Sequence, residues 1–552
     1  MLPSVAPPLH HRGMEAFDFI IVGAGSAGCV LAERLSASGR WSVLVLEAGP
    51  SDRRLWIKLP VGYGRTFYDG RVNWKYRAEP DPGLDNRTAY WPRGRVVGGS
   101  SSINALVYCR GLPHDFDDWR EAGALGWGWR DVEPVFAKIE GRIDRAGAPV
   151  AAGPLAVADV TDETHPIKRR FFDAARELGL PSTDDLNGAS PEGVGVYHIT
   201  RRRGLRCSAA DAFLRPALKR KNVALKVEAR ATRIVMNGRR AEGVEYEIQG
   251  SSATARARRG IILSAGAIGS PQLLQLSGIG PGALLRAHGV ETIVDLPAVG
   301  SHLQDHLAVS YRYRSREPTL NDALSRWPGR LQAGLKYVLT RSGPFSLSVN
   351  QCGGFVRSDP SRPFPDLQLY FNPLAYTTAS EGGGPIVKLD PFSGFLLSYQ
   401  PSRPTSRGEI AIASPDPRRT PLIRPNSLST EKDAADVIAG GRLLRALVAT
   451  KTMRDVIAAP IGPSIEAMDD DALLADFRAR CGTVFHPVGT CRMGTSARDS
   501  VVDPSLKVHG ANGLRVVDAS VFPSITSGNT NAPTIMVAYK AAEAILNDAT
   551  AG

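Results

Sequence analysis

Two glycine-rich segments about 70 residues apart constrain the fold of this chain more than any other feature. The first, residues 23–28, has the pattern GxGxxG and directly follows an apolar, β-branched run at residues 17–22. Such a run is typical of a buried parallel strand. Glycines at this spacing allow a tight turn, close approach of the backbone to a pyrophosphate, and close packing of a helix on the strand. The second segment, residues 94–104, is rich in glycine and serine. A nicotinamide site needs only the first segment, so the pair indicates a flavin dinucleotide.

The residues that follow GxGxxG complete a dinucleotide-binding unit. We predict a helix from Ser26 to about Gly39 and a second strand at residues 42–46. The free N–H groups at the start of that helix favour a phosphate. Glu47 closes the second strand, 24 residues after Gly23, where a carboxylate can accept hydrogen bonds from ribose hydroxyls. Because glycine-rich turns are common, the order strand, turn, helix, strand and acid predicts dinucleotide binding, and GxGxxG alone does not.

Three sets of motifs resemble the signatures of the glucose–methanol–choline (GMC) flavin oxidoreductases. Residues 94–104 resemble GRxxGGSSxxN, and the aromatic residue, glycine and acid that follow it are Tyr108, Gly111 and Asp117. Residues 266–280 resemble the second signature, and residues 486–494, 518–520 and 529–534 resemble the C-terminal one. The resemblance covers about residues 16–548 and is strongest to the branch of bacterial choline, aliphatic-alcohol and sorbose dehydrogenases.

The resemblance implies an α/β (α+β) fold with two domains, which also suits a length of 552 residues. A Rossmann-like FAD-binding domain is expected from residues 16–157, 206–308 and 482–552. Residues 158–205 and 309–481 are expected to form a substrate-binding domain. Partial alternation at residues 367–371 and an apolar run at 395–399 suggest an antiparallel sheet over the flavin, backed by helices at 328–341 and 429–449. Residues 1–15 are expected to be a disordered tail, with Met14 as an alternative start.

The resemblance also implies which residues touch FAD. Some relatives carry a histidine, linked covalently to the flavin, immediately before the asparagine of the first signature. Ile103 stands at that place, so we expect non-covalent FAD. No metal site is expected. The residues expected at the cofactor are Gly23, Gly25, Ser26, Ala27, Gly28, Glu47, Ala48, Arg95, Val97, Gly99, Ser100, Asn104, Ala105, Leu106, Val107, Ala231, Asp518, Ala519, Asn531 and Thr534.

Oxidation of an alcohol requires a group that accepts the hydroxyl proton, while the flavin takes the hydride. His486 is the leading candidate because its imidazole can take a proton near neutrality and then hydrogen-bond the alkoxide. The family places a second active-site residue, His or Asn, at a position that we assign to Asn531, with Asn529 as a turn residue. Asn531 is expected to position the substrate, although it also suits an Asx turn at the start of a helix. His302 and His306 flank a sequence that resembles a structural turn of the family.

The substrate is harder to read from the sequence. Choline-type relatives usually have a glutamate where this chain has Gln351, so we expect a neutral primary alcohol to be preferred over choline, unless another carboxylate, such as Glu381 or Asp390, folds into the chamber and replaces the missing one. We expect electrons to pass to a quinone or another acceptor. An oxygen-using alcohol oxidase, a choline or sorbose dehydrogenase and a non-redox hydroxynitrile lyase of the same fold remain alternatives.

Composition limits the setting. No apolar run reaches the roughly 18 residues of a membrane span, and residues 1–13 lack the apolar centre of a signal peptide. The 6 cysteines are scattered without metal-type spacing, which favours a reducing cytoplasm. The net charge of +12 lies in short basic runs without a nucleic-acid motif, so no nucleic-acid partner is expected. Weak peripheral contact with a membrane stays open.

Overall fold

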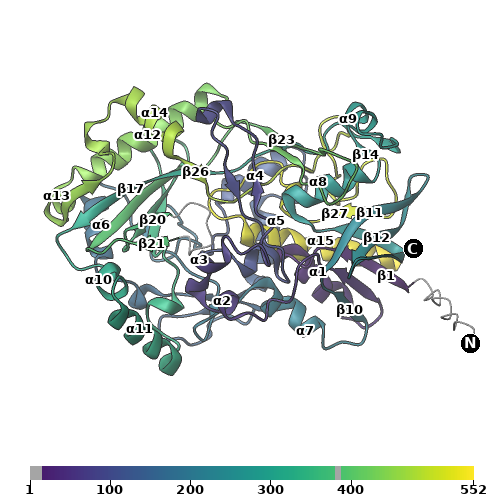
Figure 1. The fold of residues 1–552 in the computed structure, drawn as a ribbon, viewed down its shortest axis with the longest axis horizontal. Coiled ribbons are helices and arrows are strands. Elements are labelled where there is room, and N and C mark those ends of the chain that lie inside the picture. Colours follow the sequence, from purple (N-terminus) through teal and green to yellow (C-terminus); the bar gives the residue numbers. More distant parts are fainter. Residues whose placement is uncertain (1–14, 379–386, 552) are drawn as a thin grey trace, which may run out of the picture.

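The computed structural model describes residues 15–378 and 387–551 (Figure 1). The first described residue, Glu15, already belongs to strand β1 (Glu15–Val22), so the expected tail is one residue too long at that end. The rest of that tail, residues 1–14, lies outside the described residues. Glu381, one of the two carboxylates named above as replacements for the missing glutamate, also lies outside them.

A seven-stranded sheet forms one half of the molecule (right side of Figure 1). Its strands β10, β2, β1 and β13 lie side by side in parallel, and β27 pairs in parallel with β13. Two further strands, β12 and β11, continue the sheet in antiparallel order. The sheet therefore joins segments that are far apart in the chain: β2 (Val43–Leu46), β10 (Val223–Lys226), β11 (Ala229–Asn237), β12 (Arg240–Ile248), β13 (Ser251–Leu263) and β27 (Leu514–Val516).

Helices cover this first sheet. Helix α1 (Ser26–Ser36) begins inside the GxGxxG motif, directly after Gly25, and packs against α15 (Asn531–Ala551). Helix α8 (Gly266–Leu276) follows β13 through a second glycine turn. The predicted strand–turn–helix–strand order is confirmed, and α1 ends three residues before Gly39. The residues of β1 from Phe19 to Val22 and all four residues of β2 are buried between these layers, which explains their continuous hydrophobic sequence.

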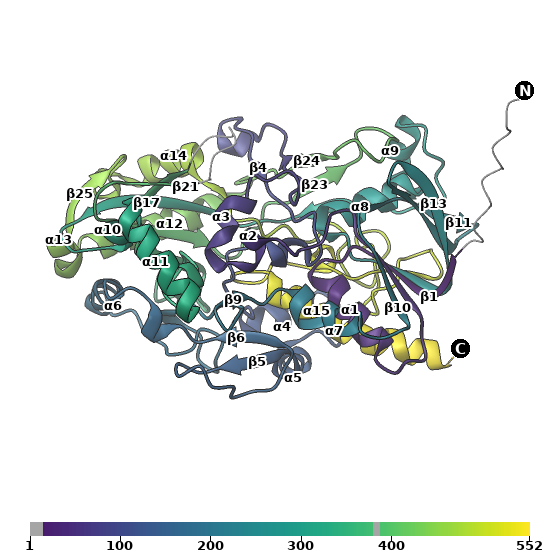
Figure 2. The ribbon, with the colours of Figure 1, turned by 60° about the horizontal axis from the view of Figure 1, so that its bottom comes forward.

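A six-stranded antiparallel sheet forms the other half (left side of Figure 1). Its order is β18–β19–β22–β17–β25, with β26 paired to β17. Helices α12 (Glu431–Val448) and α14 (Asp470–Arg480) pack on this sheet (Figure 2), and α11 (Trp327–Thr340) lies at the lower left edge of the molecule in Figure 1. The fold-class prediction is confirmed. The strands are β17 (Leu307–Ser315), β18 (Cys352–Val356), β19 (Leu367–Asn372), β22 (Gly394–Pro401), β25 (Ile457–Ile461) and β26 (Gly482–Thr483).

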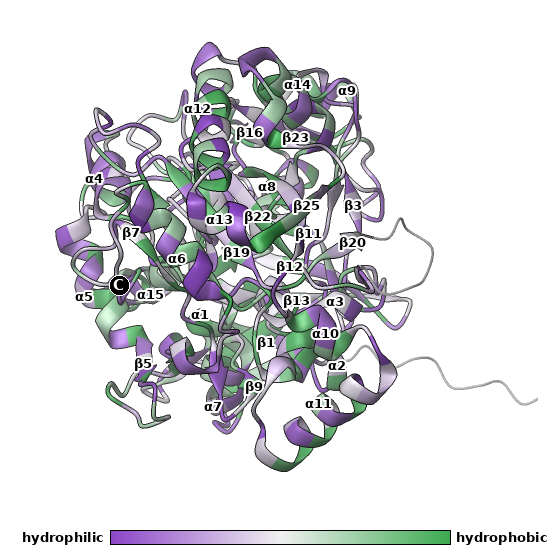
Figure 3. Ribbon diagram, turned by 90° about the vertical axis from the view of Figure 1, so that its left-hand side faces the viewer, coloured by the Kyte–Doolittle hydropathy of each residue, from purple (hydrophilic) through white to green (hydrophobic). Residues whose placement is uncertain are grey.

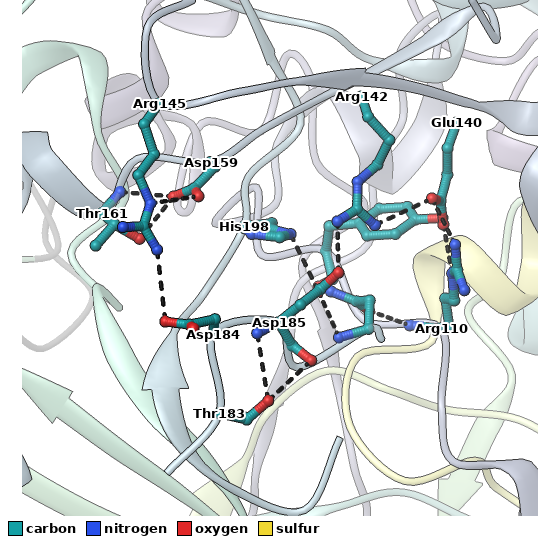
Figure 4. A network of polar contacts seen from close by, with 12 residues as sticks. Arg110, Glu140, Arg142, Arg145, Asp159, Thr161, Thr183, Asp184, Asp185 and His198 are labelled. Atoms are coloured by element: carbon teal, nitrogen blue, oxygen red, sulfur yellow. Dashed lines mark hydrogen bonds and ion pairs between the residues drawn. The ribbon is translucent and has the colours of Figure 1, made fainter. Parts of the chain in front are cut away.

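A buried ion network ties the segment around residue 185 to the first sheet's half (Figure 4). The carboxylate of Glu140, 2% exposed, accepts hydrogen bonds from the hydroxyl of Tyr108 at 2.7 Å and from Arg110 Nε at 2.5 Å. Arg142 links Glu140 to Asp185, with 2.5 Å between its Nη2 and Asp185 Oδ2. Since the buried Glu140 has positively charged partners, the cluster ties the chain that follows the glycine-serine segment to the segments around residues 140 and 185.

The 6 cysteines are all buried and unpaired. None of the helices in the described ranges is both long enough and apolar enough to cross a bilayer.

Candidate active site

One cavity of about 750 Å³ is lined by residues from both halves of the molecule. The carboxyl ends of β1, β2 and β13 and the first turns of α1 and α15 form one end of it. Residues of β17, β19 and β22 and the segment around His486 form the other end. Clefts at the carboxyl ends of parallel strands are the usual place for ligands in such folds, so this cavity is the candidate active site.

The two glycine segments meet at the first end. Gly98 N donates a hydrogen bond of 2.7 Å to Ala24 O. A Cβ on Gly99, which has a φ of +54°, would lie 2.7 Å from the Cα of Gly25. A Cβ on Gly28 would lie 1.9 Å from Gly23 O, whereas one on Gly25 would meet nothing closer than 3.8 Å. Gly28 therefore serves helix packing, and Gly25 leaves the open backbone that a diphosphate needs.

Two buried carboxylates hold the backbone of this end. Glu47 accepts hydrogen bonds from the N–H groups of Ala24 at 2.9 Å and Gly49 at 2.8 Å. Asp518 accepts from Gly266 N at 2.8 Å and from Ser270 Oγ at 2.6 Å. Burial raises the pKa of Glu47 to about 7 and raises that of Asp518 above its ordinary value. Each carboxylate lines the cavity and still has lone pairs for a ligand hydroxyl.

Most of the residues expected at the cofactor line the cavity, and three do not. Gly28 packs inside the unit, Arg95 donates to Gly70 O and lies over Trp74, and Val97 is buried in the hydrophobic core. The residues that do line it are Gly23, Gly25, Ser26, Ala27, Glu47, Ala48, Gly99, Ser100, Asn104, Ala105, Leu106, Val107, Ala231, Asp518, Ala519, Asn531 and Thr534.

His486 is held at the other end by a strained backbone. The preceding residue, Phe485, has a φ of +71°, a conformation that an aromatic residue rarely adopts. Three hydrogen bonds enforce it: Arg93 Nη1 to Phe485 O at 2.7 Å, Phe485 N to Thr483 Oγ1 at 2.9 Å, and His486 N to Asp305 Oδ1 at 2.7 Å. Such stored strain is typical of a functional site.

A second histidine fixes the proton positions on His486. His306 lies just before β17 and His486 just after β26, and the pairing of Leu307 with Thr483 brings the two rings together. His306 Nε2 is 2.9 Å from the carbonyl of Ser402, so this nitrogen carries a proton and donates it. His306 Nδ1 is therefore an acceptor, and His486 Nδ1, at 3.1 Å, must donate to it. The remaining nitrogen of His486, Nε2, is left without a proton.

The asparagine beside His486 is Asn529, which corrects the assignment made from the sequence. Asn529 Nδ2 is 3.0 Å from His486 Nε2. Its carbonyl oxygen accepts from the thiol of Cys109 at 3.4 Å, which orients the amide nitrogen toward the histidine. Asn531 instead accepts a hydrogen bond of 2.8 Å from Ser26 Oγ and joins the first turns of α1 and α15. The motif spacing alone did not distinguish two asparagines on either side of Thr530.

Burial keeps both histidines neutral. Desolvation lowers the pKa of His486 well below its ordinary value, and the positive charge of Arg93 acts in the same direction. Burial lowers the pKa of His306 to about 4. A neutral His486 with a free Nε2 is the protonation state that a general base requires at pH 7.

The wall opposite the glycine segments is polar but lacks a carboxylate. Among the described residues of the cavity lining, Glu47 and Asp518 are the only acids, and both belong to the glycine-loop end. Gln351 does not reach the cavity, because its side-chain oxygen accepts a hydrogen bond of 2.8 Å from His165 N. The premise that Gln351 replaces a substrate-binding glutamate is therefore wrong. The wall consists of Tyr63, Phe67, Ala308, Ser310, Val349, Asn350, Tyr370, Asn372, Tyr376, Ser398 and Arg480.

Comparison with known proteins identifies the class. The family model for GMC oxidoreductases matches residues 17–308 and 404–538. An alcohol dehydrogenase [acceptor] of Pseudomonas putida is 41% identical over 96% of each chain. An oxygen-dependent choline dehydrogenase of Photobacterium profundum is 41% identical over 96% of this chain and 93% of its own length. The solved structure of a pyridoxine 4-oxidase from Mesorbium loti superimposes with a TM-score of 0.83 at 31% identity, covering 95% of this chain and 98% of that one.

The chain therefore belongs to the GMC oxidoreductase family and is an enzyme of the oxidoreductase class.

Proposed function

We propose that this protein oxidises a neutral primary alcohol to the aldehyde with FAD, and that electrons then pass to a quinone or another acceptor. The observation that carries the proposal is the unprotonated Nε2 of His486, which faces the cavity beside the amide of Asn529. Relatives named as alcohol and choline dehydrogenases at 41% identity support the reaction class. FAD would supply the acceptor for the hydride of the alcohol carbon.

The protein's own groups would handle the proton. The alcohol hydroxyl would donate to His486 Nε2, which takes the proton as the C–H bond breaks. Asn529 Nδ2–H would donate to the resulting alkoxide oxygen, in the same direction in which it now donates to His486. The proton on His486 Nδ1 would stay in its hydrogen bond to His306, which keeps the imidazolium ring in place. His486 is thus the base and Asn529 the positioning donor.

The cavity fits FAD in shape and in donors. Backbone N–H groups and the first turns of α1 and α15 would hold the diphosphate and the flavin, with Gly25 as the point of closest approach. Ile103 lines the cavity and offers no nucleophile, which supports non-covalent binding. We also propose the domain limits given by the sequence, with residues 16–157, 206–308 and 482–552 around the cofactor.

The preference for a neutral substrate has a new basis. A quaternary ammonium is held by aromatic faces together with a carboxylate. The substrate wall among the described residues has aromatic rings and Arg480 but no acid. Asp390, the second carboxylate named in the sequence analysis, is not among the described lining residues. Its Oδ2 lies 3.7 Å from Arg312 Nη1 and forms an ion pair with it. Choline is therefore the weaker substrate in this proposal, although choline dehydrogenases are among the relatives.

Anaerobic mixing of the FAD-loaded enzyme with a panel of alcohols tests the function. The visible absorbance of the oxidised flavin should disappear when a primary alcohol reduces it. His486→Ala should slow this step by at least about 100-fold while FAD content stays normal. A flavin that no alcohol bleaches would favour the lyase alternative, and rapid reoxidation by air would favour the oxidase.

We propose a cytoplasmic location with peripheral membrane contact.

A further inference from the structure

Helix α11 exposes an apolar stripe that no other part of the described chain covers. Five large apolar side chains repeat at helical spacing along its outer face. They are among only eleven large apolar residues that are exposed in the described ranges. The members of this α11 stripe, with exposed fractions from 50% to 81%, are Trp327, Leu331, Leu335, Val338 and Leu339.

The helix is nevertheless firmly attached to the protein. Ala333 and Tyr337 are buried on the inner face, and the hydroxyl of Tyr337 donates a hydrogen bond of 3.0 Å to Gly204 O. A helix that is packed on one side and apolar on the other is an exception here. In α12, by contrast, Val437, Leu444 and Leu447 are all buried against the second sheet. The α11 stripe is therefore a surface and not part of a core.

Positive charge surrounds the stripe. Arg326, Arg330, Lys336 and Arg341 lie on or next to α11, and no acid occurs between residues 323 and 358. None of these four side chains takes part in the ion pairs formed among the described residues. Apolar side chains flanked by unpaired bases are typical of helices that lie in the interface of an anionic bilayer. The net charge of +12 of the whole chain acts in the same direction.

A second exposed apolar pair lies beside the stripe. Helix α2 (Leu55–Lys58) exposes Leu55 and Trp56 by 68% and 44%, and Arg65 lies 5.2 Å from the Trp56 ring. Figures 1 and 2 show α2 next to α11, and Figure 3 shows apolar and polar turns alternating on α11 where it projects from the molecule. Both helices thus expose large apolar side chains, and basic residues lie on or next to each of them.

We infer that this face, the α11 stripe with Leu55 and Trp56, docks the enzyme on the surface of an anionic phospholipid bilayer. An anionic bilayer suits the face because its apolar side chains are exposed and because none of its four bases has a carboxylate partner among the described residues. Part of the cavity wall is close in sequence to this face. Val349 and Asn350 of the cavity wall follow α11 in the chain, and Tyr63 and Phe67 follow α2. This link between the face and the cavity bears on catalysis only if the proposed function holds. The docking on lipid does not depend on the proposed function.

Flotation of the FAD-loaded enzyme with lipid vesicles tests the inference. The enzyme should float with phosphatidylcholine vesicles that contain phosphatidylglycerol, and less with phosphatidylcholine alone or in high salt. The triple variant Leu331→Ser, Leu335→Ser and Leu339→Ser should lose at least about tenfold in the bound fraction. Lys336→Gln should weaken binding to the anionic vesicles only.

Matched variants on other surfaces serve as controls. Leu125→Ser replaces an apolar side chain that is 69% exposed, and Arg286→Gln removes an exposed charge on α9 (Gly282–Ala287). Both should float like the wild type, and all variants should keep their FAD and their activity with a water-soluble alcohol. The inference is wrong if the wild type does not bind anionic vesicles or if the triple variant binds equally well. It is also wrong if sedimentation without lipid shows a wild-type dimer that the triple variant dissociates, because the face then joins two copies.

Discussion

The two ends of the cavity are built by different means. At the glycine-loop end, backbone atoms form the surface, and glycines at residues 23, 25 and 99 make room for it. At the His486 end, side chains from β17, β26 and the segment before α15 converge, and hydrogen bonds between them fix their protons. Backbone geometry is encoded locally, whereas the histidine pair exists only after distant strands have paired.

The comparison yields a sharp contrast between two glycines of the same motif. Gly28→Ala places a Cβ 1.9 Å from Gly23 O, a backbone atom that cannot move away, so we expect a loss of about 3 kcal/mol in the free energy of unfolding. Gly25→Ala, with its nearest atom at 3.8 Å, should leave the apoprotein as stable as the wild type but weaken FAD binding. Denaturant titration of the apoproteins and FAD titration measure both. Equal destabilisation by the two changes would contradict the division of roles.

Two neighbouring asparagines provide a second contrast, because Asn529 lies at the His486 end and Asn531 at the glycine-loop end. Asn529→Ala removes the donor beside His486 and should slow flavin reduction about 100-fold, the usual effect of losing an oxyanion donor. Asn531→Ala removes only the acceptor for Ser26 and should weaken FAD retention more than the rate. Stopped-flow reduction with the FAD-saturated variants separates the two effects. A larger rate loss in Asn531→Ala would restore the assignment made from the sequence.

The lack of an acid on the substrate wall predicts selectivity against a cation. Choline and its neutral isostere 3,3-dimethylbutan-1-ol have the same shape, so their difference reports charge alone. We expect kcat/KM for the neutral alcohol to exceed that for choline by at least about tenfold, because no carboxylate of the described wall compensates the ammonium group. Steady-state assays with an artificial acceptor suffice. Choline as the better substrate would show that an acid reaches the wall in the working enzyme.

The smallest effect is expected at His306. His306→Leu removes the acceptor for the Nδ1 proton of His486 and should slow flavin reduction about fivefold, which corresponds to one hydrogen bond. His306→Gln offers an acceptor and a donor in similar places and should restore most of the rate.

The pH profile distinguishes positioning from simple loss of packing. Because burial holds the pKa of His486 well below 6.5, the wild-type rate should be constant from pH 8 to about 6.5 and fall only at lower pH, as the base becomes protonated. Since the neutral His306 accepts the Nδ1–H hydrogen bond of His486, which an imidazolium donates more strongly, the acid limb in His306→Leu should move toward lower pH. An unchanged limb together with a slower rate would mean that His306 acts through packing alone.

The sequence by itself determined the nucleotide-binding unit, the family and the candidate for the base, His486. Strand, turn and helix signals are local, so the region from β1 to Glu47 and the helices at 328–341 and 429–449 could be predicted to within a few residues. His486 was recognisable because its motif is contiguous. Most of the expected cofactor residues line the cavity for the same reason.

Only the tertiary structure decided what surrounds that base. Asn529 and Asn531 differ by two residues, and the start of α15 sends one to His486 and the other to Ser26. His306 resembled part of a turn until the pairing of β17 with β26 placed it against His486. Gln351 looked like a substrate residue until its hydrogen bond to the His165 N–H turned it away. Side-chain direction and contact depend on strands that pair over distances of more than 150 residues, and no local pattern encodes them.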